Sequence, residues 1–154
     1  MLRTEKSTIR DDELFIERVF QAPVSLVWRL WEEPQHMIRW WGPEGFTATD
    51  LKVDFRVGGK WEIGMISEAY PKKWSRGEFR KIEKDRRLEF SFAWADGSGP
   101  PTETIVIVEL IPEGGGTRQT FHQAPFASVE DRDSHILGWQ SLFNKQQAYA
   151  EKPS

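Results

Sequence analysis

The sequence contains no cysteine among its 154 residues. This absence excludes disulfide bonds, thiol nucleophiles, thiolate metal sites and redox relays together. Histidine is also scarce, because the three histidines His36, His122 and His135 are the only ones and lie far apart along the chain. A metal site needs ligands that cluster, so we expect no bound metal.

Long apolar runs are missing as well. No stretch approaches the roughly 20 apolar residues that a membrane-spanning helix requires, and the first twenty residues show no apolar segment followed by a cleavage site. We therefore predict a cytoplasmic protein that does not cross a membrane. A block of one charge is absent too: the formal net charge is -3, and basic and acidic residues are interspersed. We expect no nucleic-acid partner.

Aromatic side chains, in contrast, are abundant. The chain holds 8 Trp and 10 Phe, which is more than one small core needs to exclude water. Tryptophan is rarely fully buried and often lines pockets or interfaces. The composition therefore indicates either an aromatic-rich core, or a cavity or contact surface, and it leaves these alternatives open.

The length fits one domain with its own hydrophobic core. We predict a flexible N-terminal segment over residues 1–12, a single domain over residues 13–150, and a tail over residues 151–154. The segment from about residue 131 to 150 is expected to be a long helix, because apolar side chains recur at steps of three or four. These are His135, Trp139, Leu142, Phe143 and Tyr149. A helix with such a bulky face needs a concave partner.

The segments before this helix have mainly the pattern of β-strands. The clearest alternation is Leu88, Phe90, Phe92 and Trp94 against polar neighbours. The predicted order is one strand, two short helices, six strands and the long helix. The expected ranges are 13–20 for the first strand, 23–31 and 34–39 for the short helices, and 46–55, 60–67, 74–83, 87–94, 104–111 and 117–123 for the later strands.

Two glycine-rich segments predict turns. Gly58-Gly59 indicates a two-residue hairpin with primed geometry, since glycine tolerates positive φ. The segment 112–116, with three consecutive glycines, indicates another hairpin. Neither precedes a helix or is followed by Lys-Ser or Lys-Thr, so neither is a phosphate loop, and we expect no cofactor.

Four motifs follow one another along the chain: Trp40-Trp41-Gly42-Pro43, residues 54–61 (Asp-Phe-Arg-Val-Gly-Gly-Lys-Trp), Gly116-Thr117-Arg118, and His135 with Gly138-Trp139. Together they resemble the family of activator-of-Hsp-ninety-ATPase homologues, in the START-like, polyketide-cyclase-related helix-grip superfamily. The resemblance spans nearly the whole chain. It implies an α+β helix-grip fold, in which a curved seven-stranded antiparallel sheet surrounds the long C-terminal helix. It also implies a cavity between them, closed by the two short helices.

Two residues depart from the family pattern. Gln146 stands where members usually have a leucine on the long helix, and Gln119 takes an apolar strand position. We therefore expect the far end of the cavity to be wetter than in the family.

The residues that we expect to line this cavity are mostly aromatic. They are Trp40, Trp61, Met65, Phe79, Phe92, Trp94, Phe121, Trp139 and Phe143. The alternative is that they simply fill the core. His122 and His135 are the weak candidates for acid–base catalysis, because one ends the last strand and the other lies early in the next helix. Neither Ser134 nor Ser141 lies in a nucleophile turn.

Three functions remain open. The first is a binding protein that holds an apolar or aromatic small molecule, with the aromatic residues as walls. The second, implied by the superfamily, is a cyclase, dehydratase or hydrolase that uses the two histidines. The third, implied by the family, is a chaperone-linked protein of the stress response that touches a protein partner through exposed residues around Trp40, Trp41 and Arg56. The chain is expected to be a monomer or a homodimer.

Overall fold

The computed structural model describes residues 10–95 and 97–152. The expected order of elements is confirmed. It begins with β1 (Leu14–Phe20), α2 (Val24–Glu32) and α3 (Pro34–Met37). The later strands are β2 (Thr47–Val53), β3 (Lys60–Ile66), β4 (Lys73–Glu83), β5 (Arg87–Trp94), β6 (Thr104–Glu113) and β7 (Gly116–Ala124), and α4 (Val129–Ala150) follows them. The expectations for residues 1–9 and 153–154 lie outside the described residues. Residues 10–12 belong to a turn whose Asp12 carbonyl accepts a hydrogen bond from Phe126 N.

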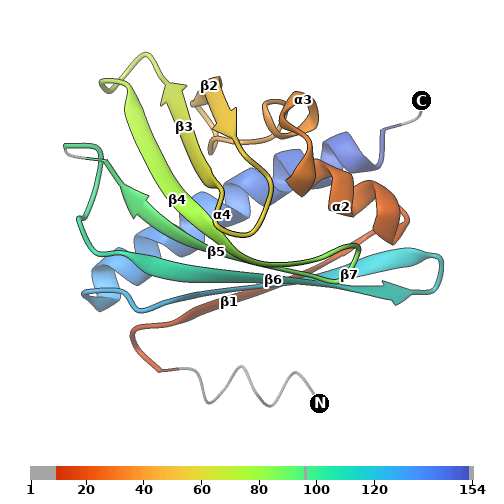
Figure 1. Cartoon of the computed structure of the whole chain (residues 1–154). Coiled ribbons are helices and arrows are strands. Elements are labelled where there is room, and N and C mark those ends of the chain that lie inside the picture. The colour runs from red at the N-terminus through yellow and green to blue at the C-terminus, as the bar shows by residue number, and fades with distance from the viewer. Residues whose placement is uncertain (1–9, 96, 153–154) are drawn as a thin grey trace.

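The seven strands form one antiparallel sheet in the order β1-β7-β6-β5-β4-β3-β2. The first strand therefore pairs with the last, and the other strands follow one another as hairpins. Figure 1 shows the sheet curving around α4, while α2 and α3 cover the region near the C-terminal end of that helix. This is the expected α+β helix-grip fold.

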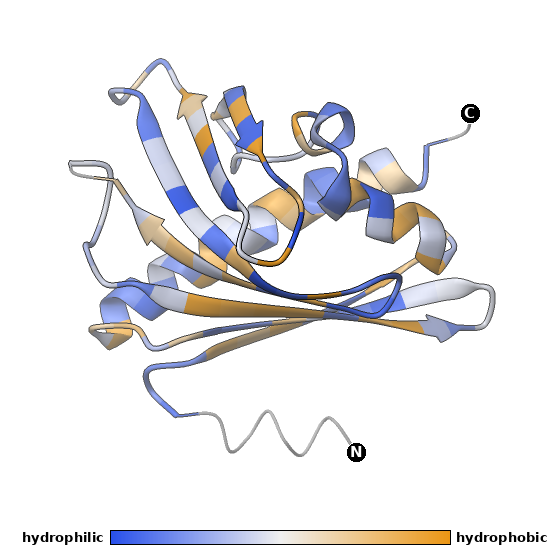
Figure 2. Cartoon of the chain, viewed as in Figure 1, coloured by the Kyte–Doolittle hydropathy of each residue, from blue (hydrophilic) through white to orange (hydrophobic). Residues whose placement is uncertain are grey.

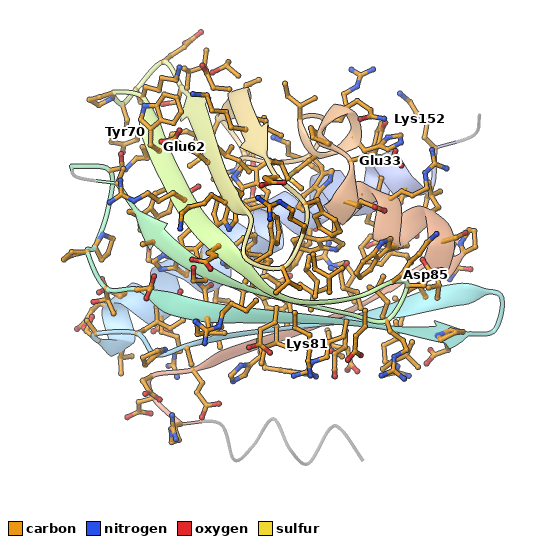
Figure 3. All side chains as sticks on the ribbon, viewed as in Figure 1. Glu33, Glu62, Tyr70, Lys81, Asp85 and Lys152 are labelled. Carbon is orange, nitrogen blue, oxygen red and sulfur yellow. The ribbon has the colours of Figure 1, made fainter. Side chains whose placement is uncertain are left out.

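Alternation along the strands sends apolar side chains inward. In β6, Val106, Val108 and Leu110 are buried and the residues between them are half-buried, as a sheet with one wet face requires. Figure 2 shows the same alternation as bands along β2 and β3. On the outer face, Lys81 projects away from the helices (Figure 3). The core thus lies between the concave face of the sheet and the helices.

The long helix begins two residues earlier than expected, at Val129, because Ser128 caps it. The Ser128 hydroxyl accepts a hydrogen bond from Asp131 N at 3.1 Å, which satisfies one of the free amides of the first turn. The predicted apolar face is confirmed for Trp139, Leu142 and Phe143, which are all buried.

The two glutamines that depart from the family pattern are buried, so the expectation of a wetter cavity end is wrong. Gln119 is 1% exposed and Gln146 is 0% exposed. Gln119 Nε2 donates to Gln146 Oε1 at 3.0 Å, and Gln119 Oε1 accepts from Trp31 Nε1 at 2.9 Å. Buried polar groups are tolerated when they bond to one another. This end of the domain is polar but closed to solvent.

The predicted two-residue turn at Gly58-Gly59 is also wrong. Residues 54–59 all lie between β2 and β3, and only Gly58 has a positive φ, of 85°. Gly58 N donates to the Phe79 carbonyl at 2.8 Å, so the loop continues to pair with β4 after β2 has ended. Gly59 is needed for another reason: a Cβ there would lie 2.0 Å from the Asp54 carbonyl oxygen. The primed two-residue turn occurs instead at Gly114 and Gly115, whose φ values are 56° and 84°.

These different roles predict different costs for alanine. Gly58→Ala should lower the free energy of unfolding by about 1 kcal/mol, the usual penalty for positive φ, since a Cβ there meets nothing within 4 Å. Gly59→Ala should cost about 3 kcal/mol, because the backbone must move to relieve the contact. Urea denaturation of the two variants measures both. Equal losses would show that the close approach at Gly59 is not what constrains the loop.

Candidate functional site

An apolar pocket of about 240 Å³ opens between the sheet and α4. Three parts of the chain surround it: α4, the loops at residues 41–46 and 97–100, and the ends of β3, β4 and β5. The residues that border it are Trp41, Pro43, Phe46, Met65, Lys73, Phe92, Trp94, Ser98, Gly99, Pro100, Asp131, Ser134, His135, Gly138, Trp139 and Leu142.

The first rim loop, residues 41–46, is fastened to α4. Lys145 Nζ donates to the carbonyl oxygens of Gly42 at 2.6 Å and Phe46 at 3.2 Å. The Ser141 hydroxyl accepts a hydrogen bond from Glu44 N at 2.6 Å. Partial burial lowers the pKa of the Lys145 ammonium, and the two carbonyls solvate it in place of water. The loop is therefore held in position before any ligand arrives.

The second rim loop, residues 97–100, is fastened to β4 and β5. The Ser98 hydroxyl accepts from Trp74 N at 2.9 Å, and the Ser98 carbonyl accepts from Lys73 Nζ at 3.1 Å. Gly99 lies flat against the Trp94 ring, where a Cβ would come within 2.5 Å of Trp94 Cγ. Only glycine permits that approach, and it places Trp94 firmly in the pocket wall.

His135 connects this wall to α4, and both of its ring nitrogens are occupied. Trp94 Nε1 donates to His135 Nε2 at 3.0 Å, and His135 Nδ1 lies 2.7 Å from the Asp131 carbonyl oxygen. A carbonyl can only accept, so Nδ1 carries the proton and the ring is neutral. Burial lowers the pKa of His135, although the Asp131 carbonyl and charge oppose this shift. His135 therefore acts here as a structural connection between Trp94 and the helix.

The residues predicted to line the cavity fall into three groups. Met65, Phe92, Trp94 and Trp139 border the pocket. Trp61 and Phe79 border a separate void of about 20 Å³, which is too small for a ligand. Trp40, Phe121 and Phe143 are each 0% exposed and fill the core. The concave sheet is thus filled along most of its length and open at one end.

The structure does not bring His122 and His135 together. Gln119, Phe121 and Gln123 of β7 are buried on the inner face, so by alternation His122 lies on the outer face. There His122 Nε2 is 2.7 Å from Glu13 Oε1, and this hydrogen bond lowers the pKa of the Glu13 carboxyl. The pair of titratable groups that catalysis was expected to use is not formed.

Trp40 and Trp41 are themselves buried, although Ile38 and Arg39 beside them are exposed. Trp40 is 0% exposed and Trp41 is 5% exposed. Their rings pack against each other at 5.6 Å between centroids, and Trp41 also contacts Trp139 at 5.5 Å. Arg56 is exposed and forms a surface ion pair with Asp54 at 2.9 Å, a contact worth at most about 1 kcal/mol.

Sequence reasoning missed several residues of the pocket. Phe46 and Pro43 belong to a segment predicted only as a loop or strand start, and Ser98 and Gly99 belong to a predicted loop. Gly138 was noticed as part of a motif but not as a wall residue. A glycine inside a helix is unfavourable, and this signal could have indicated that Gly138 faces a space.

The described residues form neither a metal-binding cluster nor a membrane-spanning helix. No group of three or more His, Asp or Glu side chains there is arranged to hold a metal ion. No helix within residues 10–95 and 97–152 has the length and apolar character needed to cross a membrane. A larger hollow of about 500 Å³ lies on the outer face of the sheet, but charged residues such as Lys52, Glu62 and Arg76 surround it.

A curved antiparallel sheet around one long helix defines the helix-grip class of proteins, and the pocket occupies one end of that grip. Within this class, the chain belongs to the family described as Activator of Hsp90 ATPase homolog 1-like protein, whose model matches residues 21–151. The resemblance seen in the sequence motifs is confirmed. No curated protein matches the chain in sequence.

Solved structures agree with this assignment. A protein from Chromobacterium violaceum is 24% identical with a TM-score of 0.86, and the match covers 94% of this chain and 100% of that one. A protein from Arthrobacter aurescens is 30% identical with a TM-score of 0.79, over 94% of this chain and 88% of that one. The AHSA1 protein from Silicibacter pomeroyi is 23% identical with a TM-score of 0.79, over 88% and 95%.

The connection through His135 predicts a dependence of stability on pH. Its pKa in the folded chain is lowered by burial, so below about pH 6.5 the unfolded chain binds more protons than the folded one. The stabilising contribution is complete above that pH and is lost as the pH falls. In urea melts, the advantage of the wild type over His135→Phe in free energy of unfolding should shrink as the pH falls from 7.5 to 5.5.

The two proteins differ at residue 135 alone, so the contributions of all other groups cancel in the comparison. A constant difference between wild type and His135→Phe across this pH range would contradict the neutral, buried state of His135.

Proposed function

We propose that this protein binds a small apolar or aromatic molecule in the pocket between the sheet and α4. The observation that carries the proposal is the pocket itself: about 240 Å³ of space bordered largely by aromatic and aliphatic side chains. Protein interiors are close-packed, so open space of this size next to a filled aromatic core is unusual. Concave, mainly apolar pockets with a few polar groups are typical ligand sites.

The volume limits the size of the ligand. An apolar cavity of about 150 Å³ holds one benzene molecule. The present pocket therefore suits one substituted aromatic ring or two fused rings. Phe92, Trp94 and Trp139 supply ring faces and edges, which favour aromatic partners over flexible chains.

The rim supports the same proposal, because both loops are fixed by hydrogen bonds of their own. Lys145 and Ser141 hold residues 42–46, and Ser98 holds the other loop to β4. A pocket that is formed beforehand loses less conformational entropy when a ligand binds. Fixed walls also make binding depend on ligand shape.

The two alternative functions have less support. Catalysis was expected to use two histidines, but His122 lies outside the pocket and both ring nitrogens of His135 are occupied. The family name refers to activation of a chaperone ATPase. The surface expected to serve such a partner lies around Trp40 and Trp41, which are both buried, and Arg56, whose exposed side chain is paired with Asp54.

Calorimetric titration with phenol, 2-naphthol and 4-phenylphenol tests the proposal. The wild type should bind 2-naphthol best, because the third compound exceeds the pocket. Met65→Ala removes a wall residue and should shift the preference toward 4-phenylphenol by about tenfold, or 1.4 kcal/mol. Shape should matter more than charge in this series.

Ile63→Ala is the matched control. Ile63 lies two residues from Met65 on the same buried face of β3, but it borders the small closed void rather than the pocket. It should lower stability and leave the order of affinities unchanged. If none of the three compounds shows saturable binding to the wild type, the proposal fails.

A further inference from the structure

The charged groups around the pocket are unevenly placed. Among the described residues that border it, Lys73 is the one cation. Lys73 begins β4 and pairs directly with Met65 of β3, so it lies at the strand ends of the pocket. Asp131 lies in the first turn of α4 and also borders a second small void beside Thr104 and Gln123.

Lys73 differs from the neighbouring lysines in what it bonds to. Lys72 Nζ is 2.6 Å from Asp50, and Lys60 Nζ is 3.2 Å from Glu78. Lys73 Nζ donates to the neutral Ser98 carbonyl at 3.1 Å and lies 5.8 Å from the centroid of the Tyr70 ring, while no carboxylate of the described residues lies within ion-pair distance. An ammonium group has three donors. Two of them are therefore free at the edge of an apolar pocket.

The wall of the pocket that α4 forms contains Gly138. It lies inside α4 and borders the pocket, and a Cβ added to it would meet nothing within 4 Å. Glycine is the least favourable residue in a helix interior apart from proline. Packing therefore does not require glycine at this position, whereas a flat ligand lying against the helix would.

We propose that the ligand is a flat aromatic carboxylic acid whose ring lies against Gly138 and whose carboxylate is bound by Lys73. This inference rests on the proposed function and names the ligand class. The ring would occupy the aromatic part of the pocket near Trp139. The carboxylate would accept hydrogen bonds from the free N–H groups of Lys73. Such charge-assisted hydrogen bonds are stronger than neutral ones.

The other charges support this orientation. Asp131 would repel a carboxylate at the N-terminal end of α4, so the anionic group is directed toward Lys73. His135 is neutral and its two ring nitrogens are already bonded, so it offers no donor to a second anionic group. A single carboxylate therefore suits the site better than a phosphate, which needs several donors.

Two matched probes test the inference: 2-naphthoate and its neutral amide, 2-naphthamide, titrated by calorimetry at pH 7.5. The wild type should bind the acid at least about tenfold more tightly than the amide. Lys73→Met keeps the side-chain length but removes the charge, and it should abolish this preference by weakening the acid more than the amide, while the Ser98 hydroxyl still holds the rim loop through Trp74 N. Lys73→Arg should retain part of the preference.

Lys72→Met is the matched control. It removes the same charge from the neighbouring residue, whose side chain is paired with Asp50. It should behave like the wild type. Gly138→Ala should raise the melting temperature by roughly 2 to 4 °C, since alanine favours the helix, and should weaken the binding of both probes.

The outcomes separate the two proposals. Equal affinity for acid and amide in the wild type, or an unchanged preference in Lys73→Met, overturns the inference and leaves the binding function in place. Binding of neither probe overturns both. Undiminished binding to Gly138→Ala would contradict the placement of the ring.

Discussion

Trp139 joins α4 to the concave face of the sheet through one polar contact and several aromatic ones. Its Nε1 donates to Gln123 Oε1 at 2.7 Å, and its ring lies 4.5 Å from that of Phe121 and 5.9 Å from that of Phe92, between centroids. On one side of this indole the interior is filled, and on the other side it is open. The same residue therefore completes the core and forms the floor of the pocket.

Hydrogen bonds from buried glutamine side chains fix the position of α4 against the sheet. Gln123 Nε2 donates to Thr104 Oγ1 at 2.8 Å while its oxygen accepts from Trp139, and Gln119, four residues earlier on the same face of β7, bonds to Gln146. Such bonds contribute little net stability, but a shifted helix would leave them unpaired inside the protein at a cost of about 1 to 3 kcal/mol each. They therefore favour a single position of α4, and with it a single shape of the pocket.

The helices and strands could be predicted from the sequence because alternation and helical spacing are local signals, whereas their arrangement in a helix-grip fold was implied by the family resemblance. The patterns predicted the order of elements along the chain and the helix face formed by Trp139 and Phe143, but not the cap at Ser128. The pocket was harder to predict, since nothing in the local sequence distinguishes Phe92, which borders it, from Phe121, which is fully buried in the core. That distinction depends on where two distant loops meet α4. The prediction of a two-residue turn at Gly58-Gly59 failed for a similar reason. The close approach of Gly59 to the Asp54 carbonyl oxygen leaves no pattern in the sequence.

The central claim is that ligand enters the pocket beside Met65, and methionine methyl NMR tests it most directly. Met65 borders the pocket, whereas the equally buried Met37 borders the separate void of about 20 Å³ instead. With ¹³C-methyl methionine labels, saturating 2-naphthol should move the Met65 methyl resonance and leave that of Met37 in place. An unchanged Met65 signal under saturation, or an equal displacement of both, would contradict the account.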